Sequence, residues 1–219
     1  MIKISKRLEV IAKYVSDDSK VVDIGCDHGL LDIYLYNNKK DISIIASDVN
    51  KNALNNAIKN IEKYKLRDKI EVVISDGLDN IDSNNIDTIV MAGMGAHTIV
   101  GILYSNTKKL KNVNDIIIQS NNDIDFLREK ITKIGYYIES EELVKDASII
   151  YTVIKFKKGH RFYTKKQLYF GPCLMKDNSD LFREKKKIEL SKLESIYPMI
   201  PKSYLLYRLK TWKKIRMYK

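Results

Sequence analysis

Apolar and polar positions alternate in blocks along the first 158 residues of the chain. Short, largely apolar runs predict buried strands at 20–25, 42–47, 70–75, 86–92 and 115–119. Apolar residues at helical spacing predict helices at 4–15, 30–37, 51–64, 98–104 and 123–134. Strands and helices that alternate in this way predict parallel βαβ units, in which helices cover both faces of the sheet.

Two further strands, predicted at 136–144 and 148–157, follow each other with no helix between them. Strands joined so directly form an antiparallel pair. A parallel sheet that ends in such a pair is typical of class I methyltransferases, whereas nucleotide-linked dehydrogenases lack the pair. We therefore expect an α/β fold with a Rossmann-like sheet of the class I methyltransferase type.

The pattern changes after Gly159. A basic connector at 160–178 leads to two long helical stretches, predicted at 179–197 and 202–217. Pro198 and Pro201 lie between them, and proline interrupts a helix. Two such helices around a short turn predict an antiparallel, coiled-coil-like helical hairpin at the C-terminal end of the chain.

Basic residues are concentrated in this second part. The whole chain carries 39 Lys and Arg against 28 Asp and Glu, a net charge of +11. Residues 1–154 carry 20 against 23, a net charge of −3, whereas residues 155–219 carry 19 against 5, a net charge of +14. A segment with this excess repels itself unless a partner supplies the opposite charge. We expect a catalytic domain at 1–158 and a basic helical domain at 159–219 that binds nucleic acid, with an anionic membrane surface as the alternative partner.

Several classes of protein are disfavoured. The chain has no apolar run long enough to span a bilayer and no apolar stretch followed by a cleavage site, so we expect a cytoplasmic protein without membrane contact. Cys26 and Cys173 are too few to cage zinc, and the three histidines are scattered, so we expect no metal site. A monomer is favoured, although no motif decides the oligomeric state.

The first predicted strand runs into the turn Asp23-Ile-Gly25-Cys-Asp27-His-Gly29. Glycines let a backbone turn sharply beside a ligand, and the following helix offers free N–H groups. The spacing does not match the dinucleotide fingerprint, and Asp27 would repel a pyrophosphate. An acidic turn suits a ligand with ammonium and sulfonium charges, which favours S-adenosylmethionine over NAD. The alternative is an ordinary α/β loop that happens to contain two glycines.

Acidic residues also follow the next two strands. Asp48 comes 23 residues after Gly25, close to the place where Rossmann-type folds hold a ribose-binding acid. The alternative is that Asp48 or Asn50 caps the next helix. Asp76 could accept a hydrogen bond from an adenine amine, or could belong to a simple Asp-Gly turn. Acids after three consecutive parallel strands would lie along one edge of the sheet.

The fourth and fifth strands end in Ala92-Gly93-Met94-Gly95 and in Gln119-Ser120-Asn121. These turns, the opening SKRLEVIAKYV, the turn DIGCDHGLL and the connector motif FGPCL resemble the bacterial tRNA (adenine-22-N1)-methyltransferases over essentially the whole chain. The chain departs from that family's usual residues at Cys26, Gly29, Ala96 and Ser120. The resemblance implies methylation of N1 of an adenine in the D-arm of tRNA, with S-adenosylmethionine as the methyl donor.

The strand ends supply the candidate site residues. We expect the cofactor to lie against Asp23, Gly25, Asp27, Gly29, Asp48, Val49, Asp76, Gly77, Ala92, Gly93, Met94 and Gly95. For the target base we expect Asp27, His28, Asn121 and Tyr151. The alternatives are that Asn121 caps the helix that follows it, that His28 packs under its turn, and that Tyr151 and Met94 are packing residues.

Two other functions remain open on the sequence. A small-molecule methyltransferase would share the cofactor turn but has no need of the basic C-terminal part. A non-catalytic RNA-binding protein with a decayed methyltransferase domain would not be expected to keep Asp23, Gly25, Asp27, Asp48 and Asp76 together.

Overall fold

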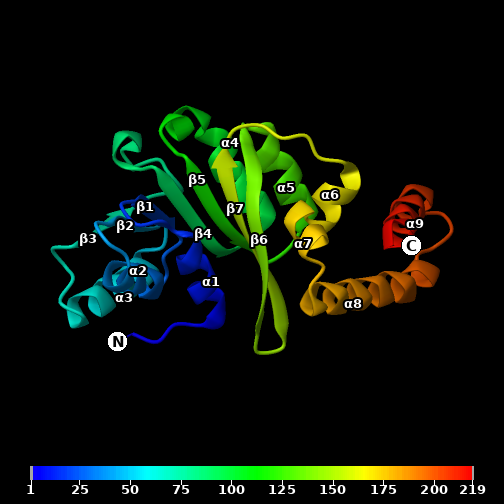
Figure 1. Ribbon diagram of the computed structural model, residues 1–219, viewed down its shortest axis with the longest axis horizontal. Coiled ribbons are helices and arrows are strands. Elements are labelled where there is room, and N and C mark those ends of the chain that lie inside the picture. Colours follow the sequence, from blue (N-terminus) through cyan, green and yellow to red (C-terminus); the bar gives the residue numbers. More distant parts are fainter. Residues whose placement is uncertain (1, 219) are drawn as a thin grey trace.

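Seven strands form one sheet in the order β3-β2-β1-β4-β5-β7-β6 in the computed structural model, which describes residues 2–218 (Figure 1). The strands are β1 (Lys20–Ile24), β2 (Ser43–Asp48), β3 (Ile70–Ile74), β4 (Thr88–Met94), β5 (Asp115–Ser120), β6 (Tyr136–Asp146) and β7 (Ile149–Lys158). The first five are parallel, and β7 pairs antiparallel with both β5 and β6. Met1 and Lys219, at the outer ends of the two expected domains, lie outside the described residues.

Five helices cover the two faces of the sheet. They are α1 (Lys6–Tyr14), α2 (Leu30–Asn38), α3 (Lys51–Lys63), α4 (Ala96–Ser105) and α5 (Ile124–Lys133). One core cluster joins the sheet to α1, α2 and α3, and a second joins it to α4 and α5. Successive residues of β5 alternate between the two, with Ile117 in the first cluster and Ile116 and Ile118 in the second. A strand buried on both faces in this way needs an unbroken apolar run.

The expected strands and helices are confirmed, and their ends move by three residues or fewer. The basic connector at 160–178, for which no element was predicted, contains α6 (Lys165–Phe170) and α7 (Pro172–Asp177). Thr164 and Gln167 form a capping box that begins α6, and Pro172 occupies the first turn of α7. Each helix has six residues, which is too short for a helical period to show in the sequence.

The C-terminal hairpin consists of α8 (Asp180–Ile196) and α9 (Leu205–Tyr218), joined through a 3₁₀ turn at Tyr197–Met199. The Arg208 guanidinium donates to the Ile200 carbonyl at 2.6 Å, and the Tyr218 hydroxyl donates to Glu189 at 2.8 Å. These contacts at the two ends of α9 confirm the antiparallel arrangement. In Figure 1 the hairpin lies beyond α6 and α7, at the opposite end of the molecule from β3. No helix within residues 2–218 is long and apolar enough to cross a bilayer.

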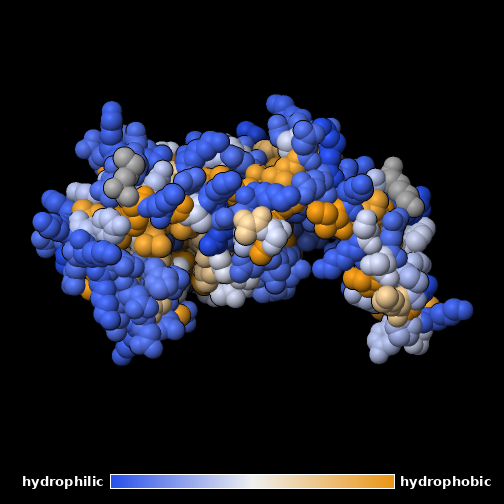
Figure 2. All heavy atoms as spheres, turned by 90° about the horizontal axis from the view of Figure 1, so that it is seen from below, coloured by the Kyte–Doolittle hydropathy of each residue, from blue (hydrophilic) through white to orange (hydrophobic). Residues whose placement is uncertain are grey.

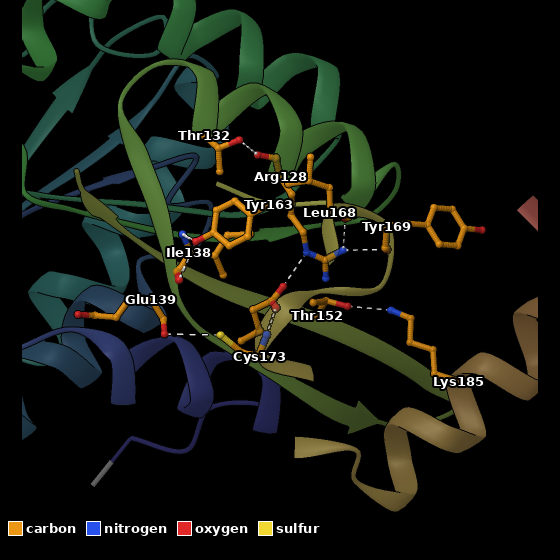
Figure 3. A network of polar contacts seen from close by, with 11 residues as sticks. Arg128, Thr132, Ile138, Glu139, Thr152, Tyr163, Leu168, Tyr169, Cys173 and Lys185 are labelled. Atoms are coloured by element: carbon orange, nitrogen blue, oxygen red, sulfur yellow. Dashed lines mark hydrogen bonds and ion pairs between the residues drawn. The ribbon is translucent and has the colours of Figure 1, made fainter. Parts of the chain in front are cut away.

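A buried ion pair joins α6 and α7 to the α/β body. Arg128 of α5 donates from Nε to Glu141 of β6 at 2.6 Å, and their side chains are 2% and 0% exposed. The Arg128 Nη1 also donates to the carbonyl oxygens of Leu168 and Tyr169, while Glu141 accepts from the Cys173 N–H at 3.0 Å (Figure 3). Backbone groups of the connector therefore satisfy both buried charges.

Gly171 of the FGPCL motif lies between α6 and α7, directly against this ion pair. Its φ is +95°, and a Cβ atom there would lie 2.7 Å from Arg128 Nη2 and from both Glu141 carboxylate oxygens. A larger residue would therefore collide with the two charged groups as well as strain the backbone. The close approach of the backbone to the ion pair therefore explains the glycine of the FGPCL motif.

Glu141→Gln should lower the free energy of unfolding by about 3–5 kcal/mol, because the Arg128 charge stays buried without a compensating carboxylate. Chemical denaturation of the purified variant measures the loss. The neighbouring Glu142→Gln is the matched control, since Glu142 pairs with Lys13 at the surface and should cost less than about 1 kcal/mol. Equal losses in the two variants would contradict the role of the buried pair.

Candidate active site

A cavity of about 710 Å³ opens where the parallel strands end, at their carboxyl edge. Ten of the twelve expected cofactor residues line it, namely Asp23, Gly25, Asp27, Asp48, Val49, Asp76, Gly77, Ala92, Gly93 and Met94. His28 lines it as well. The structure therefore brings together the turns that follow β1, β2, β3 and β4.

The two remaining glycines, Gly29 and Gly95, lie outside this lining, at the starts of α2 and α4. Gly29 adopts φ +66° at the start of α2, and a Cβ atom there would lie 3.2 Å from the Cβ of Ala57 on α3. Gly95 begins α4, whose Ala96 N–H donates to the Asn122 side chain at 2.9 Å. Both glycines shape the turns behind the cavity lining.

Asp48 braces the turn that follows β1. Its carboxylate accepts from the Asp27 N–H at 3.3 Å and from the Asn50 N–H at 2.8 Å. Asn50, and not Asp48, caps α3, because the Asn50 Oδ1 accepts from the Asn52 N–H at 2.8 Å. The Asp48 carboxylate therefore stays at the cavity wall, with the helix cap supplied by its neighbour.

Gly25 and Gly77 both adopt positive φ in the cavity lining, but a Cβ atom would meet different surroundings at each. A Cβ atom on Gly25, where φ is +79°, would lie 3.5 Å from the Met94 sulfur. A Cβ atom on Gly77, where φ is +56°, would come within 2.7 Å of Ile102 on α4. Met94 is half-buried and lines the cavity opposite Gly25, so it both packs and faces the site.

Two buried carboxyl groups lie beneath the β1 turn. Asp23 is 3% exposed and Asp32 of α2 is fully buried, and within residues 2–218 neither oxygen of Asp32 has a hydrogen-bond partner. Burial raises the pKa of Asp32 to about 7. Burial, followed by the charges of Asp32 and Asp48, holds the pKa of Asp23 well above its usual range. The two carboxyls therefore resist being ionised together.

Cys26, in the same turn, is buried and remains a thiol. Burial raises the pKa of Cys26 far above its ordinary value, and the neighbouring acid Asp32 raises it further. A protonated, buried thiol is a poor nucleophile. Within residues 2–218, no three His, Cys, Asp or Glu side chains are grouped as metal ligands.

The end of β4 is irregular, and the side chains of β5 fix it. The pairing with β5 shifts register between Ala92 and Met94, around Gly93 at φ +77°. The Gly93 N–H donates to the buried Gln119 Oε1 at 3.1 Å, and the Gly93 carbonyl accepts from Asn121 Nδ2 at 2.6 Å. Asn121 is therefore not the cap of α5 and instead braces the irregular end of β4.

Ser120 also connects the ends of β4 and β5 by hydrogen bonds. Its hydroxyl donates to the Met94 carbonyl at 3.2 Å and lies 3.0 Å from the Asn122 carbonyl. The Asn121 N–H donates to the Met94 carbonyl at 3.0 Å. The serine at this position thus holds the backbone around Asn121 by hydrogen bonds.

The structure places the expected target-base residues at three locations, and Tyr151 lines neither cavity. His28 is exposed, and its Nε2 lies 3.6 Å from the Asp27 carboxylate at the cavity, so it does not pack under its turn. Asn121 lines a second cavity of about 480 Å³, between the start of α5 and the hairpin. Tyr151 is half-buried on β7, and the Arg7 guanidinium lies 5.3 Å from its ring centroid.

Sequence reasoning missed Arg7, a residue that lies between the cavity and Tyr151. Arg7 lines the cofactor cavity, faces Tyr151, and donates from Nη1 to Gln119 Oε1. The segment SKRLEVIAKYV was recognised as a helix and as a motif of the family, but no site role was predicted for Arg7. The helical spacing of its apolar residues predicts a buried face, but it does not predict that the helix lies across the strand ends near Gly93. Thr98 and Ile102 of α4 were missed for the same reason.

Asp32→Asn should raise the free energy of unfolding at pH 8 by roughly 2–4 kcal/mol. An unfolded aspartate ionises from about pH 4, whereas native Asp32 holds its proton up to about pH 7. The unfolding free energy of the unsubstituted protein therefore falls as pH rises across this window, and a neutral amide avoids the loss. Urea denaturation at pH 5, 6.5 and 8 measures the difference, which should grow with pH.

The exposed Asp68→Asn is the control, and it should change the unfolding free energy by less than about 0.5 kcal/mol at each pH. A gain for Asp32→Asn that does not vary with pH would show that burial of the charge is not its cause.

Both the sequence and the fold are similar to those of known proteins. A family model described as TrmK, tRNA (adenine(22)-N(1))-methyltransferase, matches residues 21–217 of the chain. A Bacillus subtilis (strain 168) relative named tRNA (adenine(22)-N(1))-methyltransferase is 31% identical over 205 residues, which cover 91% of this chain and 86% of the relative.

Two solved structures are similar over almost the whole chain. The Streptococcus pneumoniae protein Sp1610, in complex with S-adenosyl-L-methionine, has a TM-score of 0.90 at 33% identity and covers 99% of this chain and 98% of that one. TrmK from M. capricolum, in complex with S-adenosyl-homocysteine, has a TM-score of 0.85 at 28% identity, with coverage of 98% and 96%. The chain belongs to the TrmK family of tRNA (adenine(22)-N(1))-methyltransferases.

Proposed function

We propose that this protein transfers a methyl group from S-adenosylmethionine to N1 of adenine 22 in tRNA. The observation that carries the proposal is the cavity at the carboxyl edge of the sheet. Acidic side chains from three consecutive strand ends, Asp27, Asp48 and Asp76, line it together. Family membership then specifies the reaction that such a cavity supports.

The cavity fits the cofactor in size and charge. Its volume of about 710 Å³ falls in the range of small-molecule sites, roughly 300–1,000 Å³. Asp48 follows β2, where a carboxylate can accept from ribose hydroxyls, and Asp76 follows β3, where it can accept from the adenine amine. The exposed Asp27 carboxylate supplies negative charge for the ammonium and sulfonium groups, while the buried Asp23 carboxyl lies beneath it. Gly25 leaves beside Met94 the space that a Cβ would fill.

S-adenosylmethionine supplies an electrophilic methyl group when it is bound here. N1 of a neutral adenine carries an in-plane lone pair, and the methylated base stays cationic until its exocyclic amine loses a proton. We assign Asp27, His28 and Asn121 as the hydrogen-bonding groups that face this base and its developing charge. We assign Tyr151 to the same site because its ring lies next to Arg7, which lines the cavity. Rigid alignment of the two reactants provides the remaining lowering of the barrier.

We assign tRNA binding to residues 159–219 and methyl transfer to residues 1–158. Residues 198–218 carry six basic and no acidic side chains, and Tyr204, Tyr207 and Trp212 are exposed among them. Figure 2 shows hydrophobic side chains of the hairpin set between hydrophilic ones. Lysine and arginine neutralise phosphates, and exposed aromatic rings stack on unpaired bases. A hairpin with both properties suits a folded RNA with loops.

Incubation of unmodified tRNA with the protein and S-adenosylmethionine should give a reverse-transcription stop at adenine 22, because an N1-methyl group blocks base pairing. At limiting cofactor, Asp48→Ala should lose the stop, and excess cofactor should restore it, since the substitution removes ribose contacts. Asp79→Ala, an exposed acid further along the chain from Asp76, is the matched control and should behave as the unsubstituted protein.

The tRNA in which adenine 22 is replaced by guanine serves as the substrate control and should give no stop. Methyl transfer only to small acceptors, or to another tRNA position, would overturn the proposed function.

Replacing Lys210, Lys213 and Arg216 of α9 by glutamine should weaken tRNA binding and flatten its dependence on salt. Each lost phosphate contact removes roughly 0.7–0.9 from the slope of log affinity against log salt, so three should remove about 2. Binding isotherms at several salt concentrations give the slopes. Cofactor affinity, measured by calorimetry, should not change.

The control replaces three exposed lysines of the opposite end, Lys59, Lys63 and Lys69, by glutamine and removes the same net charge. An equal drop in slope from this variant would mean that overall charge, rather than the hairpin, governs binding.

A further inference from the structure

Arg7 begins a chain of directed hydrogen bonds that ends at the proposed target-base side chain. It is half-buried on α1, outside the strand-turn-helix units that build the cofactor cavity. Its Nη1 donates to Gln119 Oε1 and lies 3.4 Å from the position that a Cβ atom on Gly93 would take. Its guanidinium carbon lies 5.3 Å from the centroid of the Tyr151 ring. Arg7 therefore touches both the turn after β4 and the start of β7.

The direction of the hydrogen bonds at Gln119 is set by groups that can only donate. A guanidinium has no acceptor and stays charged at every relevant pH, and a backbone N–H likewise only donates. Arg7 and the Gly93 N–H, the latter at 3.1 Å, both point at the same atom of Gln119, which must therefore be its oxygen. The Gln119 amide nitrogen is left to face Asn121.

The orientation of the Gln119 amide in turn determines which atom of the Asn121 side chain faces it. The Gln119 Nε2 donates to Asn121 Oδ1 at 3.1 Å, and the Asn121 Nδ2 donates to the Gly93 carbonyl at 2.6 Å. An amide oxygen accepts two hydrogen bonds, so Oδ1 keeps one lone pair after the bond from Gln119. Asn121 is exposed at the edge where the proposed base site lies. That lone pair is available to an incoming donor.

Arg7 adds the larger part of the free-energy penalty for the flipped orientation of the Gln119 amide. Flipping the Gln119 amide would bring its NH₂ group against two donors inside a fully buried position, where water cannot compensate. Without Arg7, a single backbone N–H would oppose the flip. Asn121 would then be oriented by the Gly93 carbonyl alone, without the matching donor from Gln119.

We propose that Arg7 is a positioning residue that, through Gln119, holds Asn121 with its oxygen toward the exocyclic amine of the target adenine. An oxygen accepts from that amine, whereas a base with a carbonyl at the same place would need a donor. The arrangement thus favours adenine and holds it while its N1 is methylated. This inference rests on the proposed function, since it assumes that adenine enters at Asn121.

A double-mutant cycle between Arg7 and Asn121 tests the proposal. Arg7→Met and Asn121→Ala should each lower kcat for tRNA methylation by about 10- to 100-fold at saturating cofactor. The double variant should be no slower than Asn121→Ala alone, because Arg7 acts through Asn121. Because Arg7 also lines the cofactor cavity, calorimetry gives the cofactor Kd of each variant, and kcat is measured at saturation so that a change in Kd does not enter it; KM for tRNA should stay within about threefold of the unsubstituted protein.

Arg7→Lys separates an orienting role from packing. An ammonium is also a permanent donor, so this variant should recover at least about tenfold of the kcat that Arg7→Met loses. Losses that multiply in the double variant, a fully active Arg7→Met, or an Arg7→Lys as slow as Arg7→Met would each overturn the inference. If the unsubstituted protein itself transferred no methyl group to adenine 22, the proposed function would fail, and the two failures are thereby distinguished.

Discussion

Parallel pairing of β1 with β2 and β4 is the constraint on which the rest of the site depends. Parallel strands stop at one edge, so five separate turns meet there without any local signal that they belong together. The acids, the glycine turns and the β4 bulge are neighbours only because the ladder aligns them. The long apolar runs that specify the parallel strands are therefore the indirect cause of the cofactor cavity.

A buried ion pair is a second constraint, and it holds the connector before the basic hairpin against α5 and β6. The Arg128–Glu141 pair draws the backbone of α6 and α7 against α5 and β6, and Gly171 is the residue that permits the approach. A buried pair of this kind adds little net stability but makes other arrangements costly, since each would strand a charge. The hairpin is thus held in one place relative to the cavity, and the second cavity, between α5 and the hairpin, follows from that placement.

Much of this could be predicted from the sequence, for reasons that particular residues show. Apolar runs and helical periods gave the sheet and its helices, and the spacing of Gly25, Asp48 and Asp76 gave most of the cavity lining. The competition between Asp48 and Asn50 for the helix cap could not be decided, because both can cap and only the backbone selects Asn50. Arg7 was out of reach, because its role depends on how α1 crosses β5, more than a hundred residues away. The short helices α6 and α7 escaped detection because capping and tertiary contacts, rather than periodicity, stabilise them.

Two adjacent residues of β7 serve opposite sides of the molecule. Tyr151 faces α1 and Arg7, whereas the Thr152 hydroxyl accepts from Lys185 of α8 at 2.7 Å (Figure 3). Neighbouring side chains on a strand point to opposite faces of the sheet, so the contact with α1 and the contact with α8 come from adjacent residues of one strand. A substitution that shifts this stretch of β7 would therefore disturb the strand-end cavity, through Arg7, and the hairpin, through Lys185, at the same time.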